Sequence, residues 1–245
     1  RADFDLHWDA ARQMLVVPFQ ILSGGNRITL LAQLTAPREG ATPGWVLKIS
    51  GGSAVLAPSP RDPDALVLNR IQIGLRIDPD KQRIDVEQGE IGNMDLGLAI
   101  SGGIDYSSRE PRLAVGIAGT RMSVAAMKRL WPSFISPKVH AWVAENILSG
   151  TVERIVIATN APMATLKTVG PPIPDDGLAI EVSGNGAEIR PVHGLPAIKD
   201  ADVKVRITGR TASVTVGRGK PSAHTGGPLS QGKLRLTRSS DRSLS

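Results

Sequence analysis

Apolar residues occupy every second position along most of this chain, which is the pattern of β-strands that turn one face away from water. Between residues 28 and 36, aliphatic side chains alternate mainly with Thr and Gln, and between residues 67 and 77 they alternate with Arg and Gln. Further alternating stretches lie at residues 45–49, 83–87, 96–100, 113–117, 152–157, 203–207 and 214–216. This repetition predicts a mainly β protein.

Short polar segments separate these stretches and read as hairpin turns. Ser23-Gly-Gly-Asn26, Asp78-Pro-Asp-Lys81 and Thr208-Gly-Arg210 supply the Gly, Asn and Pro residues that tight turns favour. Gly184-Asn-Gly186 is interpreted in the same way. Because strands joined this tightly pair antiparallel, we predict an antiparallel meander rather than alternating strands and helices.

Two helices are predicted near residues 123–149. A short one spans 123–130, and a longer one follows with Ser136 as N-cap, Pro137 in its first turn and Gly150 after its end. The longer helix places Val139, Trp142, Val143 and Ile147 on one side.

Two segments lack a regular pattern. Residues 160–177 are rich in Pro and are interpreted as an irregular connection. Residues 217–232 are rich in Gly and Ser and are interpreted as a flexible linker. Residues 233–238 alternate again, as a strand whose partners are missing.

The aliphatic face of such a sheet has to be covered. A helix of roughly 14 residues is about 21 Å long, too short to cover some ten strands. The sheet therefore curls on itself, packs as a two-sheet sandwich, or encloses a guest such as an acyl chain, and alternation alone leaves these options open. If the face lines a groove, its residues are Ile28, Leu30, Leu34, Ile71, Ile73, Leu75, Ile84, Val86, Leu96, Leu98, Leu113, Val115, Val203 and Val205.

Catalytic and metal chemistry finds little support in the sequence. The chain has no cysteine, which excludes a thiol nucleophile, a disulfide and a cysteine zinc site. Its four histidines, His7, His140, His193 and His224, lack metal-ligand spacing, and the carboxylate pairs Asp78/Asp80 and Asp175/Asp176 are interpreted as solvated turns. We expect a non-catalytic protein without a metal or cofactor.

Positive charge is concentrated at the C-terminal end. Residues 199–245 contain ten Lys or Arg and three Asp or Glu, whereas residues 1–198 are nearly neutral. No aromatic residue is available there for base stacking, so we expect no nucleic-acid partner. No apolar run approaches the roughly 18 residues of a membrane-spanning helix, and we expect the chain to be a piece of a longer, anchored polypeptide.

A family resemblance rests on a set of spaced residues. They are Trp131-Pro132, Pro137, Trp142-Val143, Ile147 and Gly150-Thr-Val152, with Leu195-Pro-Ala-Ile-Lys-Asp200 further on and Leu6-His-Trp-Asp9 and Leu15-Val-Val-Pro-Phe-Gln20 near the start. This pattern resembles AsmA-like proteins of the YhdP type over roughly residues 4–216.

The resemblance implies a fold and a function. AsmA-like proteins are bacterial envelope proteins held by an inner-membrane helix, with a periplasmic body that forms a curled, groove-like β-sheet. Residues 1–216 would then be a groove segment with a helical insert at 123–149, followed by a basic linker at 217–245. The expected partners are phospholipid acyl chains, carried between the inner and outer membranes, and the rest of the same polypeptide. The alternative is a structural or assembly module of the outer-membrane biogenesis machinery, with a closed sandwich core.

Overall fold

The computed structural model describes residues 1–38, 40, 42–57, 59–131, 137–166, 171, 173–190, 197–221 and 232–237. It is mainly β, with antiparallel strand pairing and two short α-helices, which confirms the predicted fold class. The chain divides into two compact units, unit 1 (Arg1–Thr120) and unit 2 (Arg121–Ser245). No helix in the parts of the chain described is long and apolar enough to span a membrane.

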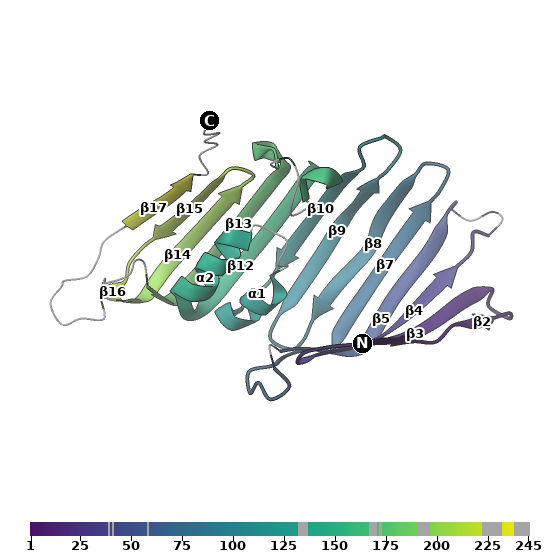
Figure 1. The fold of residues 1–245 in the computed structure, drawn as a ribbon, viewed down its shortest axis with the longest axis horizontal. Helices are drawn as coiled ribbons and strands as arrows, with labels where there is room; N and C mark the ends of the chain where they lie inside the picture. The colour runs from purple at the N-terminus through teal and green to yellow at the C-terminus, as the bar shows by residue number, and fades with distance from the viewer. Residues whose placement is uncertain are drawn as a thin grey trace, which may run out of the picture. The chain divides into compact units, whose positions relative to one another are not determined.

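Unit 1 is an antiparallel sheet whose strands neighbour one another in chain order (Figure 1). Its strands are β1 (Ala2–Phe4), β2 (His7–Asp9), β3 (Met14–Ser23), β4 (Asn26–Thr35), β5 (Trp45–Leu56), β6 (Leu66–Leu68), β7 (Arg70–Asp78), β8 (Arg83–Gly92), β9 (Gly97–Asp105) and β10 (Arg112–Gly119). Strands β1 and β2 both pair with β3, and β6 and β7 both pair with β5. Figure 1 shows β7–β9 face-on and β2 and β3 nearly edge-on, so this sheet curls along its N-terminal side.

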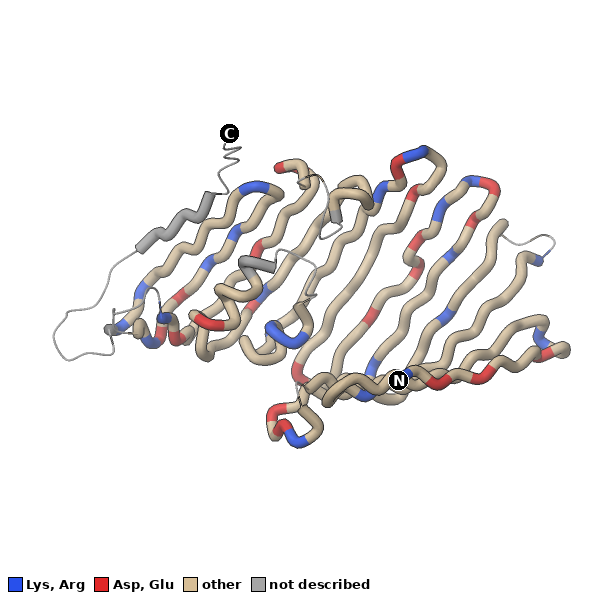
Figure 2. Tube along the Cα trace, viewed as in Figure 1, with Lys and Arg blue, Asp and Glu red and all other residues tan. Residues whose placement is uncertain are grey.

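The predicted hairpins of unit 1 form where Gly and Asp allow tight turns. Ser23 pairs with Asn26, and Gly24 between them has φ of 60°, which glycine adopts without a steric penalty. At the β7–β8 turn the carboxylate of Asp78 accepts the backbone N–H of Lys81 at 3.0 Å, and this hydrogen bond lowers the pKa of Asp78. Figure 2 shows basic and acidic residues intermixed at this hairpin.

Unit 2 combines further antiparallel strands with both helices (Figure 1). Its elements are β11 (Met122–Ser123), α1 (Val124–Leu130), α2 (Pro137–Asn146), β12 (Ile147–Pro162), the 3₁₀ turns η1 (Met163–Leu166) and η2 (Asp175–Gly177), β13 (Leu178–Ile189), β14 (Ile198–Thr208), β15 (Thr211–Val216), β16 (Lys220–Pro221) and β17 (Gly232–Thr237). Strands β11 to β15 pair in chain order, β16 pairs with β14, and the third predicted hairpin joins β14 to β15. The side chain of Ser123 caps α1 by accepting the N–H of Ala126.

Two local predictions in unit 2 were wrong. The second helix ends at Asn146 instead of near residue 149, because Ile147 pairs with Ile189 and opens β12, in which Gly150 has φ of 132°. Residues 184–186 are not a hairpin turn. They lie within β13, where the register with β14 shifts between Gly184 and Ala187, so this Gly-Asn-Gly sequence forms a β-bulge.

The C-terminal strand was predicted correctly, but its partner was not. Strand β17 pairs with β15 from Gly232↔Val216 to Thr237↔Thr211, so its partner is within this chain. The irregular connection predicted for residues 160–177 begins only after Pro162, because β12 continues to that residue. Several predicted features lie outside the described residues: Pro132, Ser136, His193, Leu195, Pro196, His224 and most of the linker at 217–232.

Candidate functional site

Aliphatic side chains from seven strands of unit 1 share one face of its sheet. Residues paired directly across antiparallel strands lie on the same face, so the strand register assigns each residue to a face. One row across the sheet runs through Leu15, Leu34, Leu47, Leu75 and Val86. The full set, here called the aliphatic face, comprises Leu15, Val17, Phe19, Ile21, Ile28, Leu30, Ala32, Leu34, Leu47, Ile49, Ile71, Ile73, Leu75, Ile77, Ile84, Val86, Ile91, Leu98, Ile100, Ile104, Leu113, Val115 and Ile117.

The opposite face of the same sheet is polar. It carries an Arg76–Glu87 ion pair with Nε and Oε1 2.5 Å apart. Gln88 donates a hydrogen bond to Gln72 across β7 and β8 at 2.9 Å. Lys48, Ser50 and Arg83 are exposed on it. The sheet of unit 1 is thus two-sided, with an aliphatic face and an opposite face that is mainly polar but also carries Val16, Leu31 and Val46.

Most of the aliphatic face is only half-buried. Ile71 is 6% exposed, but Leu30, Leu34, Ile73 and Leu75 are intermediate. At the margin, Ile21 and Trp45 are 37% and 36% exposed. No helix occurs among the described residues of unit 1, and all its described strands belong to this single sheet. An apolar surface that stays partly exposed over this many strands is a candidate binding site.

Two glycines help to keep this face level. A Cβ atom on Gly51 would come within 2.1 Å of Leu30 Cδ2, and one on Gly89 would come within 2.7 Å of Ile100 Cβ. Both distances are far below van der Waals contact, so each large side chain lies over a glycine of the adjacent strand. Because these large side chains lie over positions without a side chain, the surface of the aliphatic face is more even than it would be with a large residue at every position.

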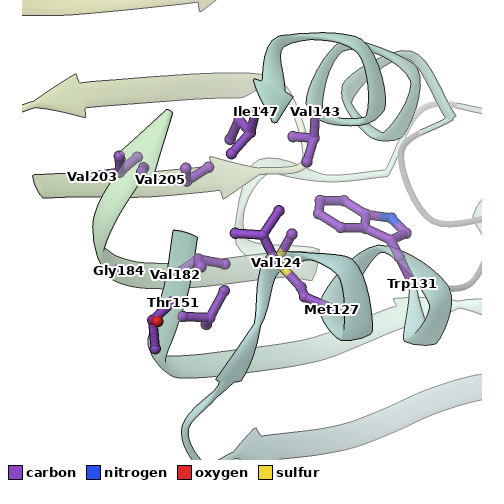
Figure 3. Close-up of a pocket in the computed structure, with 12 residues that line it drawn as sticks. Val124, Met127, Trp131, Val143, Ile147, Thr151, Val182, Gly184, Val203 and Val205 are labelled. Atoms are coloured by element: carbon purple, nitrogen blue, oxygen red, sulfur yellow. The ribbon is translucent and has the colours of Figure 1, made fainter. Parts of the chain in front are cut away.

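The corresponding face in unit 2 is closed by the two helices. Its sheet contributes a core in which Ile180, Ile189 and Ile207 are 1%, 1% and 2% exposed, and Trp131 and Trp142 pack against this core. Figure 3 shows Val124 and Met127 of α1 and Val143 of α2 pointing toward Val182, Val203 and Val205. The space between them is about 30 Å³, room for about one water and too small for an acyl chain.

The structure brings most of the predicted groove residues together. Eleven lie on the aliphatic face of unit 1: Ile28, Leu30, Leu34, Ile71, Ile73, Leu75, Ile84, Val86, Leu98, Leu113 and Val115. Val203 and Val205 are instead buried beneath the helices of unit 2, and each is only 7% exposed. Leu96 precedes β9 in a turn and is 4% exposed.

The predicted groove lining left out the residues of β3 and the aromatic residues beside it. Leu15, Val17 and Phe19 are on the aliphatic face, but Val16 and Pro18 between them hide the alternation. Phe4 pairs with Phe19 and Trp8 pairs with Leu15, so both belong to the same face, where they are 69% and 51% exposed.

Lys128 joins the two helices of unit 2 to β12. Its Nζ donates hydrogen bonds to the carbonyl of Ala144, at 3.0 Å, and to that of Ile147, at 2.5 Å. Partial burial lowers the pKa of Lys128, because removing the ammonium from water disfavours its charged form. These two bonds satisfy carbonyls at the point where α2 ends.

Replacing Lys128 with Met should destabilise unit 2 by about 1–2 kcal/mol, since the two carbonyls lose a charged donor while the aliphatic stem is kept. Urea unfolding followed by tryptophan fluorescence measures this change. The matched control is Lys199→Met, because Lys199 is exposed and its ion pair with Glu188 is 4.0 Å long. Equal stability losses in the two variants would contradict the assigned role of Lys128.

Polar groups elsewhere support turns and packing. Asp175 accepts hydrogen bonds from Thr208 Oγ1 at 2.5 Å and from the N–H of Arg210, and the Thr208 bond chiefly lowers the pKa of Asp175. His140 lies beside Trp131, with ring centroids 5.8 Å apart. Within the described part of the chain, no group of three or more His, Cys, Asp or Glu side chains could hold a metal ion.

The aliphatic face of unit 1 is therefore the strongest candidate site, and its chemistry is burial of hydrocarbon. It offers a broad, smooth surface with polar groups confined to the reverse side of the sheet. Comparisons with protein-family models, with curated proteins and with solved structures found no match to this chain.

Proposed function

We propose that unit 1 binds phospholipid acyl chains along its aliphatic face, as a non-catalytic segment of a protein that carries phospholipid between the inner and outer membranes. One observation supports this above all: the face is continuous over seven strands, yet most of it is only half-buried by the chain's own residues. Covering hydrocarbon that is otherwise in contact with water lowers the free energy, so an apolar ligand is stabilised on such a face.

The free energy released by burying an acyl chain on this face is large enough to support binding. Each buried methylene contributes about 0.8 kcal/mol, so a chain of about 16 carbons would contribute on the order of 10 kcal/mol before ordering costs. The longer strands have nine to twelve residues, which at about 3.3 Å per residue gives a face roughly 30–40 Å across in the strand direction. Such a face accommodates hydrocarbon chains without any specific polar contact.

An acyl chain suits this face better than a second layer of protein. A single covering strand would bring backbone amide and carbonyl groups that need partners, and the face presents only aliphatic side chains around its centre. A helix satisfies its own backbone groups, but no helix occurs among the described residues of unit 1. The described strands of unit 1 form one sheet, without the second sheet that a sandwich core requires. Unit 2 differs, because its helices cover its core, and this closed core supports a structural role for that unit.

The cellular setting follows from the same proposal. A carrier of phospholipid between two membranes would act in the periplasm, anchored to the inner membrane through other segments of the same polypeptide. The residues that resemble AsmA-like proteins, such as Trp131 and Trp142-Val143, support this setting.

Lipid analysis of the purified chain tests the proposal. The protein is expressed in the periplasm of a Gram-negative host, purified without detergent, and examined by native mass spectrometry and by solvent extraction with thin-layer chromatography. We expect phospholipid to be retained at about one molecule or more per chain. A folded, lipid-free protein that also fails to take up phospholipid from added vesicles would refute the proposal.

A further inference from the structure

The polar side of the sheet in unit 2 contains a hollow of about 440 Å³, on the opposite side from the helix-covered core. Two adjacent rows of paired residues form its floor across β12 to β15. The first row is Arg154, Ser183, Lys204 and Thr215, and the second is Val156, Glu181, Arg206 and Ser213. Basic and hydroxyl side chains thus line a concave surface that the proposed lipid function does not use.

Positive charge in the hollow exceeds what its one carboxylate neutralises. Arg206 donates two hydrogen bonds to Glu181 Oε1, at 3.0 and 2.6 Å, so these two residues form a pair. Arg154 and Lys204 are both exposed, and neither has an ion-pair partner among the residues that the structure describes. Two cations therefore remain available to a ligand.

The spacing of these cations suits a small oxyanion. Arg154 and Lys204 are in the same row with Ser183 between them, so their backbones are two strand spacings apart, about 10 Å. Both side chains are long and can converge on a group above Ser183.

We propose that this hollow binds a phosphate group through Arg154 and Lys204, with Ser183 and Thr215 as hydroxyl donors. Hydrogen bonds between a guanidinium or ammonium group and a phosphate are charge-assisted and about twice as strong as neutral ones. The planar guanidinium of Arg154 can also engage two phosphate oxygens at once. None of the described residues that line the hollow is aromatic, so these residues offer no platform for nucleobases.

Free phosphate and a phospholipid headgroup present the same chemistry to this site, and two probes distinguish them. Isothermal titration with inorganic pyrophosphate measures binding of the free anion to the full chain. Cosedimentation with phosphatidylcholine vesicles containing phosphatidylglycerol, compared with vesicles of phosphatidylcholine alone, measures binding of a headgroup phosphate at a membrane surface. Binding to pyrophosphate alone assigns the site to a soluble phosphate, and binding to the anionic vesicles assigns it to a lipid headgroup.

Variants that each remove one positive charge test whether the phosphate binds in the hollow. Arg154→Gln and Lys204→Gln should each weaken binding at least about tenfold, because each removes a charge-assisted bond. Arg218→Gln makes the same charge change at an exposed position outside the hollow and should alter binding less than about twofold. Circular dichroism checks that all three variants stay folded. The proposal is overturned if neither probe binds, or if Arg218→Gln weakens binding as much as Lys204→Gln.

Discussion

Replacing Ile73 with Asp is expected to remove bound phospholipid while unit 1 stays folded. Ile73 lies near the middle of the aliphatic face, between Ile49 on β5 and Gly89 on β8, and its side chain is half-buried. On an open sheet the new carboxylate can reach water, so we expect it to cost unit 1 no more than about 2 kcal/mol. Beneath an acyl chain the same carboxylate would be buried without a partner, at a cost of several kcal/mol.

The measurement is phospholipid per chain after detergent-free purification, which should fall at least tenfold in Ile73→Asp. Ser50→Asp is the matched control, because Ser50 is exposed on the polar face of the adjacent strand β5 and receives the same new charge. This variant should keep its lipid. Retention of lipid by Ile73→Asp, or global unfolding of that variant, would count against an open acyl-binding face.

Ile180→Asp is expected to have the opposite effect and unfold unit 2. Ile180 is 1% exposed and lies in a core with Ile207, Val205 and Trp142. A carboxylate there has no water and no cation, so the loss of stability should be about 4 kcal/mol or more, enough to unfold a marginally stable domain.

Tryptophan fluorescence during urea unfolding measures this loss, since Trp131 and Trp142 pack against the core of unit 2. Ala179→Asp provides the control, because Ala179 is the neighbouring residue on the exposed side of β13 and should cost about 1 kcal/mol or less. A stable, folded Ile180→Asp protein would mean that the helices do not close this face.

Alternation in the sequence predicted strands, faces and hairpins well, because each of these depends on local spacing. The Gly24 and Asp78 turns and the shared face of Ile73, Leu75 and Val86 all follow from it. Prediction from local spacing was wrong where pairing between segments distant in the sequence determined the secondary structure. Ile147 fitted a helical face, but its pairing with Ile189 made it a strand residue.

The difference between the two units could not be read from alternation. Val203 and Val205 follow the same pattern as Ile73 and Leu75, yet helices cover the first pair and leave the second half-buried. Which face a helix covers depends on tertiary packing by residues such as Met127 and Val143, far from those strands in the sequence. The candidate site was therefore predicted as a set of strands, and the structure limits it to unit 1.

Site-specific photocrosslinking tests most directly whether hydrocarbon lies on unit 1. A photoreactive phenylalanine derivative is introduced at position 73 or, separately, at position 50, and cells that express the protein are irradiated before adducts are identified by mass spectrometry. Phospholipid adducts are predicted at position 73 and not at position 50. Folded protein that gives no adduct at position 73, or equal adducts at both positions, would contradict a lipid-bearing aliphatic face.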